Sequence, residues 1–500
     1  MSVHWPIIRT CLARPSAPII TDDRRTWRSA EVLVGAMHVA DVIAAKSTTQ
    51  TLGLLLPTSG ATAVAALAGW MLGRTIVPLN YLLKPDELQY VIDDCGTDTI
   101  LTAEPLLEHI RSTGGRDPRV KNLIRLETLS YKGVPDPRWP SLRGIGDSAD
   151  ELALLLYTSG TSGKPKGVML SHRNLATNVR QCVDWVNFTR HDTLLGVLPQ
   201  FHSFGMTVLT LLPLTVGCKV VYSARFVPNN IVRLLRQHRP TALIAIPSMY
   251  NALLSVKDAT PEDFSSLKYV VSGGEPLSEP VAREFRDRFD VTINEGYGLT
   301  ETSPVTNWCR PHEFRPRSVG KPLPNVIERI VDPATGADLP PGHDGEVWIA
   351  GPNIMHGYLH LAEETARALT PDGFLRTGDM GRFDHDGHLY ITGRIKEMII
   401  VGGENVFPRE IEEALDAHPA VQASGVVGYR DELRGETPVA FIELKEGFAQ
   451  PSESELRSWC RERLAGYKVP SDIRVVEALP KGPTGKVLRR ELHAIANHKP

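Results

Sequence analysis

Short apolar runs alternate with helix-like segments along much of the chain. Residues 52–56 form an apolar run that ends at a turn of Pro, Ser and Gly, and residues 61–72 are rich in strong helix formers. Another apolar run covers residues 75–80, after which Pro85 opens a helical segment with acids in its first turn. Strands that alternate with helices in this way predict parallel sheets covered by helices.

The same alternation resumes beyond residues 113–150, a stretch rich in Gly, Pro and mixed charge that we interpret as a variable connection. A helix is expected to begin at Ser171. In a doubly wound sheet, ligands lie beyond the carboxyl ends of the strands, so the turns that follow the strands are where a bound molecule is expected. The predicted strands are residues 152–156, 194–199, 220–222, 241–247 and 269–274.

From about residue 316 the pattern changes. Short alternating strands such as residues 345–350, with frequent turns, predict a small β-barrel or a distorted antiparallel sheet. The acids and histidines of residues 384–388 suggest a metal site. A hairpin turn at Asp-Gly, between Phe383 and a strand at residues 389–391, explains them more simply.

The bulk composition narrows the class of protein. A chain of 500 residues is too long for one core, so two or more domains are expected. Its 42% hydrophobic and 23% charged residues are typical of a folded soluble protein. A net charge of -3 gives no global electrostatic reason to expect a nucleic acid partner. The six cysteines have no paired spacing for zinc or redox chemistry, which favours a reducing, cytoplasmic compartment; they are Cys11, Cys95, Cys182, Cys218, Cys309 and Cys460.

Two long uncharged runs raise the question of a membrane. Residues 47–73 and 193–218 carry no Lys, Arg, Asp or Glu and are long enough to span a bilayer. Both contain polar turns with proline, which would expose backbone groups in lipid, so buried strands and helices are the better interpretation. The first residues also lack the basic start and apolar core of a signal peptide. At most a peripheral membrane contact is expected.

Residues 157–167 are rich in hydroxyl side chains, glycine and lysine, directly after an apolar strand. Backbone N–H groups, hydroxyls and ammonium groups are what polyphosphate oxygens require, so we predict a phosphate-binding loop. It differs from a Walker loop because Pro165 stands where that pattern needs glycine, and an ordinary surface turn is the alternative. The candidate phosphate contacts are Thr158, Ser159, Gly160, Thr161, Ser162, Gly163, Lys164 and Lys166.

Residues 295–301 form a second motif. It resembles a dinucleotide fingerprint only in its first three positions, because Glu301 stands where a third glycine or alanine belongs. It offers an aromatic ring, a hydroxyl and a carboxylate within five residues. The alternative is a core tyrosine and an acid at a helix start. The candidate residues are Glu295, Gly296, Tyr297, Gly298, Thr300 and Glu301.

Further candidates are isolated side chains and turns, for which a solvated surface position or a simple turn is the alternative. One of them is Asp379. The others are Gly274, Glu275 and Pro276 after a predicted strand, Arg394, Lys396, the turn Gly402, Gly403 and Glu404, and Lys486 in a Gly/Pro loop near the end.

Taken in order from the strand at Leu52 to Lys486, these motifs resemble those of the adenylate-forming, or AMP-binding, superfamily. That superfamily includes acyl-CoA synthetases, adenylation domains of peptide synthetases and luciferases. The resemblance implies an α/β fold with two domains. A large N-terminal AMP-binding domain, residues 1–394, would hold two doubly wound αβαβα subdomains and a small distorted β-barrel. A small mobile α+β domain, residues 395–500, would follow.

The resemblance also implies roles for the candidate residues. The loop at residues 157–167 would bind ATP phosphates, and the turn at residues 272–276 would lie beside adenine. Tyr297 would position adenine, Thr300 the α-phosphate and Glu301 a Mg²⁺ ion. Asp379 would bind ribose, and Arg394 would also reach the nucleotide. Lys486 would be the catalytic lysine that offsets repulsion between two anions, together with Thr300 and Glu301.

The implied reaction has two steps. A carboxylate attacks the α-phosphorus of ATP and pyrophosphate leaves, after which a thiol attacks the acyl-adenylate and expels AMP. No covalent enzyme nucleophile is needed, so positioning and charge neutralisation supply the acceleration. Lys396 matches the hinge of the family, and Gly402, Gly403 and Glu404 match the loop that approaches coenzyme A. A rotation about Lys396 would withdraw Lys486 and bring that loop to the site.

Residues 199–206 match the aromatic motif on the substrate side of the family, with Phe201, His202 and Met206 as candidate contacts beside Gly296. Members that activate amino acids place an aspartate near His202, and its absence argues against an amino acid. The apolar residues 206–214 favour an acyl chain, with core packing as the alternative. The whole resembles bacterial medium- or long-chain fatty-acyl-CoA synthetases and acyl-acyl-carrier-protein synthetases, through residues 198–205 and 351–358.

We therefore expect a fatty-acid–CoA ligase. One alternative is transfer of the acyl group to the phosphopantetheine thiol of an acyl carrier protein. An alternative of another class is a nucleotide- or acyl-AMP-binding protein without turnover.

Overall fold

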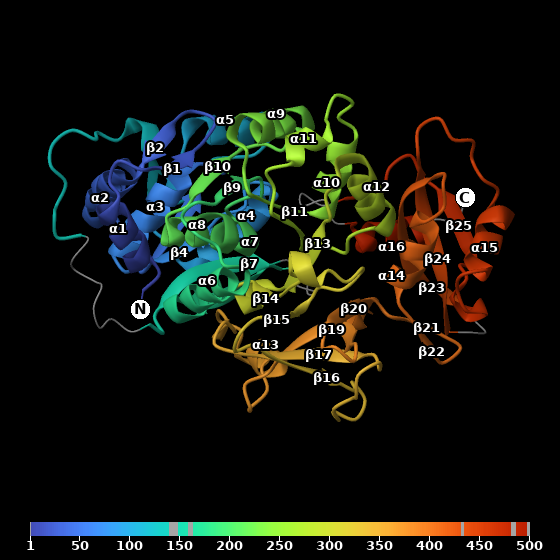
Figure 1. Cartoon of the computed structure of the whole chain (residues 1–500). Helices are drawn as coiled ribbons and strands as arrows, with labels where there is room; N and C mark the ends of the chain where they lie inside the picture. Colours follow the sequence, from blue (N-terminus) through green and yellow to red (C-terminus); the bar gives the residue numbers. More distant parts are fainter. Residues whose placement is uncertain (1, 140–148, 159–163, 432–434, 482–486, 498–500) are drawn as a thin grey trace.

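The computed structural model describes residues 2–139, 149–158, 164–431, 435–481 and 487–497. A large N-terminal unit contains two wide sheets, a small antiparallel sheet lies below them in the view of Figure 1, and a C-terminal unit lies to one side. The predicted mixed α/β class, with a large unit followed by a small one, is confirmed. The division at residue 394 stays a prediction.

The first sheet has seven strands in the order β18-β8-β7-β4-β3-β5-β6. Its central strands are parallel and buried, which fits the apolar runs in the sequence. β7 and β8 are antiparallel and flank the predicted phosphate loop. The strands are β3 (Thr51–Leu55), β4 (Thr75–Pro78), β5 (Thr99–Thr102), β6 (Asn122–Arg125), β7 (Leu152–Thr158), β8 (Lys166–Ser171) and β18 (Gly357–Tyr358); the helices in this part are α2 (Ser29–Lys46), α3 (Gly60–Met71), α4 (Pro85–Cys95), α5 (Glu104–Ser112) and the short η1 (Leu126–Thr128).

The second sheet has nine strands in the order β15-β14-β13-β12-β11-β9-β10-β1-β2. Six of these strands, β1, β9, β10, β11, β12 and β13, are parallel to one another, as predicted for a doubly wound arrangement. The strands are β1 (Pro18–Thr21), β2 (Thr26–Arg28), β9 (Thr193–Gly196), β10 (Lys219–Tyr222), β11 (Ala242–Ala245), β12 (Tyr269–Ser272), β13 (Asn294–Gly298), β14 (Val305–Trp308) and β15 (Lys321–Pro322).

The helices around the second sheet include one that joins both wide sheets. α6 (His172–Val186) contacts β7 and β8, and its Trp185 Nε1 donates to the carbonyl of Trp308 in β14 at 2.8 Å. Ser171 caps it by accepting from Asn174 N. The others are α1 (His4–Ala13), α7 (Ser203–Met206), the π-helical η2 (Thr207–Leu211), α8 (Leu212–Val216), α9 (Pro228–His238), α10 (Pro247–Leu254), α11 (Pro261–Phe264), α12 (Glu279–Phe289), η3 (Thr300–Thr302) and η4 (Pro311–Glu313).

The small sheet is antiparallel, in the order β16-β17-β19-β20. Its strands are β16 (Ile327–Val331), β17 (Gly345–Ala350), β19 (Leu375–Phe383) and β20 (Leu389–Arg394), and α13 (Ala362–Ala368) lies between β18 and β19 in the chain. The Asp-Gly hairpin is confirmed, because Asp384 Oδ1 accepts from the backbone N–H groups of Asp386 and His388. Within the described ranges, no three His, Cys, Asp or Glu side chains are grouped to hold a metal ion.

The C-terminal unit has a sheet and cores of its own. The sheet runs β22-β21-β24-β23, with β25 also paired to β24. Its elements are η5 (Ile395–Glu397), β21 (Ile399–Val401), β22 (Glu404–Val406), α14 (Pro408–Asp416), β23 (Val421–Asp431), β24 (Gly435–Leu444), α15 (Glu453–Arg461), η6 (Gly466–Lys468), β25 (Asp472–Val475) and α16 (Arg489–Asn497).

Most predicted elements lie within one or two residues of the observed ones. The strand predicted over 194–199 ends at Gly196, since the chain leaves the sheet before Pro199. The structure also adds β6 inside residues 113–150, where we expected only a connection. All six cysteines are buried free thiols. Among the described residues, none of the helices combines the length and apolar character needed to cross a membrane.

Candidate functional site

Tyr297, Asp379 and Arg394 meet where the second wide sheet approaches the small sheet. The hydroxyl of Tyr297 donates to Asp379 Oδ2 at 2.7 Å, and Arg394 Nε lies 2.7 Å from Asp379 Oδ1. Asp379 and Arg394 are paired neighbours on β19 and β20, so the sheet register itself places the ion pair. Asp379 is only 1% exposed. Burial and the nearby Asp379 carboxylate raise the pKa of Tyr297 well above its ordinary value, so Tyr297 stays a neutral donor.

The backbone around Asp379 is held by neighbouring side chains. Asp379 N donates to Thr377 Oγ1 at 3.0 Å, and that hydroxyl donates to the carbonyl of Val347 at 2.6 Å. Gly378 has a φ of +69°, which glycine adopts without strain, and its N–H donates to Glu346 Oε1. The carboxylate is therefore fixed in orientation before any ligand arrives.

Thr300 and Glu301 follow β13 in the short helix η3. The hydroxyl of Tyr358 donates to Glu301 Oε1 at 2.9 Å, and the carbonyl of Glu301 accepts from Met355 N at 2.9 Å. The Thr300 hydroxyl lies 3.3 Å from that of Ser203 at the start of α7. The motif of residues 295–301 thus points a ring, a hydroxyl and a carboxylate toward three different elements.

The two ends of the predicted phosphate loop are joined by the β7–β8 ladder, in which Thr158 pairs with Lys166. Lys166 Nζ lies 2.6 Å from Glu364 Oε2 and over the ring of Tyr358, and its side chain is 15% exposed. Lys164 Nζ lies over the ring of Tyr90 in α4. Ser159, Gly160, Thr161, Ser162 and Gly163, which we predicted as phosphate contacts, lie outside the described residues.

The turn after β12 is packed tightly against the substrate-side motif. A β-carbon built on Gly273 would lie 3.1 Å from the ring of Phe204 and 3.3 Å from the carbonyl of Gly296, and Gly274 has a φ of +83°. Glu295 is buried, and its Oε2 accepts from Leu277 N at 3.3 Å. The predicted residues Gly274 and Gly296 are therefore brought to one place, with Glu275 and Pro276 following in the same turn.

The substrate-side motif is anchored by a buried polar network that the sequence did not reveal. Gln200 N donates to Thr58 Oγ1, Gln200 Oε1 accepts from Ser59 N at 2.8 Å, and Gln200 Nε2 donates to Thr210 Oγ1 at 2.9 Å. Gln200 is 1% exposed, so each of these bonds replaces water.

The aromatic members of that motif pack on one another. The ring of Phe201 lies 4.9 Å from that of Tyr81 and 4.7 Å from that of His202. Met206, which we predicted as a substrate contact, is fully buried. Gly205 lies so close to Pro199 that a built β-carbon would be 2.0 Å from the Pro199 carbonyl oxygen. Only glycine fits there without a shift of the backbone.

The hinge candidate Lys396 lies in η5, between the small sheet and the C-terminal unit. Burial, with Arg394 nearby, lowers the pKa of Lys396 from its ordinary value. Gly402 and Gly403 have φ values of +61° and +91°, and Glu404, at the start of β22, is exposed. Lys486 lies outside the described residues.

The two units touch through α14. Arg409 Nη1 donates to the carbonyl of Ile391 at 2.6 Å, and Arg409 Nε bonds Glu413 Oε1 at 2.8 Å. Glu413 also pairs with Arg317 of the large unit. Burial raises the pKa of Glu295, and nearby Arg409 opposes that rise. Sequence reasoning missed Arg409, because an arginine at a helix start normally faces solvent.

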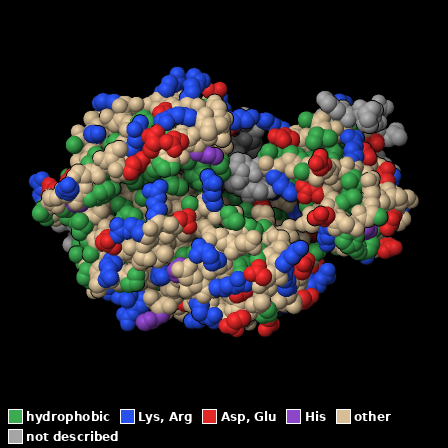
Figure 2. Space-filling view, turned by 90° about the horizontal axis from the view of Figure 1, so that it is seen from above, with side chains coloured by type: hydrophobic (Ala, Val, Ile, Leu, Met, Phe, Trp, Pro, Cys, Tyr) green, Lys and Arg blue, Asp and Glu red, His purple; other side chains and the backbone are tan. Residues whose placement is uncertain are grey.

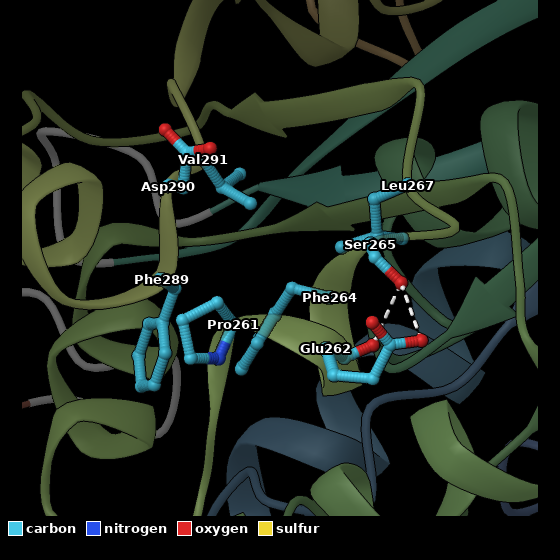
Figure 3. A pocket seen from close by; sticks show the side chains of 8 residues that line it. All are labelled: Pro261, Glu262, Phe264, Ser265, Leu267, Phe289, Asp290 and Val291. Atoms are coloured by element: carbon cyan, nitrogen blue, oxygen red, sulfur yellow. Dashed lines mark hydrogen bonds between the residues drawn. The ribbon is translucent and has the colours of Figure 1, made fainter.

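Two surface features lie apart from these residues. A hollow of about 310 Å³ opens between α11 and the end of α12 (Figure 3); its lining residues are Pro261, Glu262, Phe264, Ser265, Leu267, Phe289, Asp290 and Val291. It contains none of the candidate site residues. On the face shown in Figure 2, Lys and Arg side chains are interspersed with Asp and Glu, without a large field of one sign.

Two family models match the sequence. The model described as AMP-binding enzyme matches residues 8–359, and the model described as AMP-binding enzyme C-terminal domain matches residues 410–486. The first match includes Tyr297, Glu301 and Tyr358, and the second begins at Glu410, inside α14.

Relatives and solved structures agree with those matches. The chain is 34% identical over 476 residues to a long-chain-fatty-acid–CoA ligase of Bacillus subtilis (strain 168), with 88% of this chain and 84% of the relative covered. It is 33% identical to 4-coumarate–CoA ligase 5 of Oryza sativa subsp. japonica, over 89% and 84% of the two chains. The ATP-bound structure of MatB from Rhodopseudomonas palustris is 30% identical, with a TM-score of 0.86 over 99% of both chains. The apo structure of that same protein matches with a TM-score of 0.78.

Proposed function

This chain belongs to the AMP-binding enzyme family, and from that premise we propose that it activates a medium- or long-chain fatty acid with ATP and transfers the acyl group to coenzyme A. At the level of reaction class, the chain is an AMP-forming acid–CoA ligase, an enzyme type that uses ATP, a carboxylic acid and coenzyme A. The observation that carries the proposal is the meeting of Tyr297, Asp379 and Arg394 beside the segment that bears Glu301.

Asp379 is placed to bind the ribose of ATP. Its two carboxylate oxygens lie in a plane, and each already accepts a charged or hydroxyl donor at 2.7 Å. Two neighbouring ribose hydroxyls are also hydrogen-bond donors, so they would either replace the present donors to the Asp379 carboxylate or donate to it beside them. Tyr297 would then place its ring beside adenine, and Arg394 would stay paired with the carboxylate.

Glu301 suits a Mg²⁺ ion. Its Oε1 accepts from Tyr358, and within the described part of the chain no hydrogen bond is made to Oε2. A single ionised carboxylate oxygen, together with phosphate oxygens and water, is the donor set that Mg²⁺ prefers. When bound, the ion would neutralise charge on the phosphates.

In the first step, a carboxylate oxygen of the acid forms a bond to the α-phosphorus, and the bond from that phosphorus to the pyrophosphate oxygen breaks. Thr300, after β13, would contact the α-phosphate, and the Lys486 ammonium would offset the charge of the two anions. In the second step, the coenzyme A thiol loses its proton, its sulfur attacks the acyl carbonyl, and AMP leaves. Gly402, Gly403 and Glu404 would approach coenzyme A after the C-terminal unit turns about Lys396.

The nature of the acid is the finer part of the proposal. Residues 206–214 are apolar or hydroxyl-bearing and all buried, and an acyl chain needs only a surface that hides methylenes from water. His202, rather than an acid, occupies the motif where an ammonium would need a carboxylate. The similarity to a long-chain-fatty-acid–CoA ligase supports a fatty acid, while the similarity to a 4-coumarate–CoA ligase makes aromatic acids the principal competitors.

A panel of acids tests the proposal. Pyrophosphate release is measured with ATP, Mg²⁺ and coenzyme A for straight-chain acids from acetate to palmitate and for 4-coumarate. We expect kcat/KM to rise with chain length to a maximum at a medium or long acid. A maximum at 4-coumarate would contradict the fatty-acid assignment. Replacing coenzyme A by a carrier protein with its phosphopantetheine arm tests the acceptor, and ATP binding without acid-dependent pyrophosphate release would favour a protein without turnover.

A further inference from the structure

The backbone at Tyr358 is held by the first sheet on one side and by α13 on the other. It forms half of β18, a two-residue strand paired with β8, in which Tyr358 lies opposite Val168. Tyr358 N donates to Thr365 Oγ1 at 2.9 Å, and the next residue, Leu359, donates its N–H to the carbonyl of Gly167 at 2.8 Å. The position of the ring is therefore set by the strand that leaves the predicted phosphate loop.

The ring of Tyr358 connects two charged groups of the site. Its hydroxyl donates to Glu301 Oε1 at 2.9 Å. Lys166 Nζ lies 5.2 Å from its ring centroid and is held there by Glu364 at 2.6 Å, which in turn accepts from Arg367 at 2.9 Å. A cation over the ring face and an anion at the hydroxyl are both electrostatically favourable for tyrosine.

The hydrogen bond from Tyr358 engages one oxygen of the Glu301 carboxylate, Oε1. No described residue donates to the other oxygen, Oε2.

We propose that Tyr358 is a positioning residue that orients Glu301 toward the metal–nucleotide complex and links that orientation to Lys166 on the phosphate strand. This inference rests on the proposed function, since it assigns Glu301 to Mg²⁺. A carboxylate that is free to rotate must be ordered when the metal binds, whereas one held through Oε1 is ordered beforehand. Partners of this kind, one shell beyond a metal ligand, commonly change metal affinity by about tenfold or more.

The test uses Tyr358→Phe in the full chain, with Tyr269→Phe as the matched control. Tyr269 also has a partly buried hydroxyl with one hydrogen bond, to the carbonyl of Val186 at 2.8 Å, and it lies in the second sheet away from Glu301. Binding of Mn²⁺ with ATP, without acid, is followed through the electron paramagnetic resonance signal of Mn²⁺. We expect Tyr358→Phe to need about tenfold more Mn²⁺ for half-saturation, and Tyr269→Phe to bind as the wild type does.

A double mutant separates positioning from a general loss of structure. In Glu301→Gln, the carboxylate is gone, so adding Tyr358→Phe should change half-saturation by less than about twofold. If Tyr358→Phe weakened Mn²⁺ binding by about a further tenfold in the Glu301→Gln protein, the assignment would be overturned. Wild-type Mn²⁺ binding by the single variant Tyr358→Phe would also overturn it.

The two levels of the proposal fail in different ways. If the wild type releases pyrophosphate with an acid while Tyr358→Phe keeps a normal Mn²⁺ requirement, the role of Tyr358 is wrong and the ligase assignment stands. If the wild type binds no Mn²⁺ with ATP and releases no pyrophosphate, the proposed function itself is wrong. The apparent KM for the acid should stay within about twofold of wild type in Tyr358→Phe, because the hydroxyl contacts Glu301 and not the acid motif.

Discussion

The hydroxyl of Tyr297 donates to Asp379 Oδ2 at 2.7 Å, although Tyr297 belongs to the nine-stranded sheet and Asp379 to the small antiparallel sheet. The two residues are 82 positions apart, and each belongs to an interior strand of its sheet. The bond therefore fixes the distance between the proposed adenine and ribose contacts.

Replacing Asp379 by Asn should weaken ATP binding. The amide keeps the size of the side chain but loses the charge that attracts Arg394, and one of its two terminal groups becomes a donor. Charge-assisted hydrogen bonds are worth about 1.5–3 kcal/mol, so we expect ATP affinity to fall by about 10- to 100-fold. Isothermal titration calorimetry measures it. Asp344→Asn is the control, because Asp344 pairs with Arg382 at the exposed surface of the same sheet; equal losses in both variants would contradict the prediction.

Lys486→Ala should separate the two half-reactions. Adenylation needs a cation between the carboxylate and the α-phosphate, whereas thiol attack on a ready-made acyl-adenylate does not. We expect acid-dependent pyrophosphate release to drop by at least about a hundredfold, while thioester formation from supplied acyl-adenylate stays near the wild-type rate. Lys481→Ala, which removes a surface ion pair with Glu443, should affect neither step. Equal loss of both half-reactions in Lys486→Ala would rule out the rotation about Lys396.

Gly205→Ala should disturb the substrate-side motif. The added β-carbon would lie 2.0 Å from the carbonyl oxygen of Pro199, which is backbone and cannot rotate away. Overpacking of this kind costs about 1–3 kcal/mol of unfolding free energy. Urea denaturation should show that loss, and the KM for the acid should rise. Gly466→Ala is the control, because no atom lies within 4 Å of its built β-carbon; unchanged stability of Gly205→Ala would show that α7 can shift freely.

The stability of the C-terminal unit should fall as the pH rises toward neutrality. Burial raises the pKa of Asp416 to about 7, with Glu412 and Glu443 nearby, while the hydroxyl of Ser424 donates to its Oδ1 at 2.7 Å. Between the ordinary carboxyl pKa and about 7, the folded protein keeps a proton that the unfolded chain has released. Unfolding free energy therefore decreases with pH in that window, by at most about 1.4 kcal/mol per unit.

Asp416→Asn should remove this dependence, because the amide keeps an acceptor for Ser424 and has no proton to lose. Urea denaturation from pH 5 to pH 8 measures the slope, with the exposed Asp287→Asn as the control. The Asn variant is expected to be relatively more stable at the upper end of the range. A parallel pH profile for the wild type and Asp416→Asn would mean that Asp416 titrates normally.

The sequence predicted the wide sheets well because their central strands are buried on both faces. Such strands need continuous apolar residues, as in residues 152–156, and their ends are marked by glycine and proline. The strand predicted to Pro199 was too long, because the apolar character continues into residues 197–198 after the chain has left the sheet. Apolar character indicates burial, and burial does not require a strand.

Tyr297, Thr300 and Glu301 were named as candidates from one motif, whose residues stay close in space because they are close in sequence. Asp379 and Arg394 were named only through the family resemblance, and their contact with Tyr297 depends on how the two sheets are placed. Tyr358 was missed as a partner of Glu301, since 57 residues separate them and a tyrosine after glycine has no distinctive signal. Lys166 was expected to face phosphate, and its pairing with Glu364, 198 positions away, depends on how β18 and α13 are placed on β8.

That placement of β18 has a consequence for any attempt to divide the chain. The edge strand beside β8 is β18, whose two residues come after β16 and β17 of the small sheet in the chain. The residues before β16 therefore do not complete the seven-stranded sheet by themselves. A fragment that ended at Ala350 would expose the N–H and C=O groups of β8 as an open edge, which invites pairing between copies. Expression as separate halves is therefore expected to yield aggregates unless the C-terminal partner is present to cover that edge.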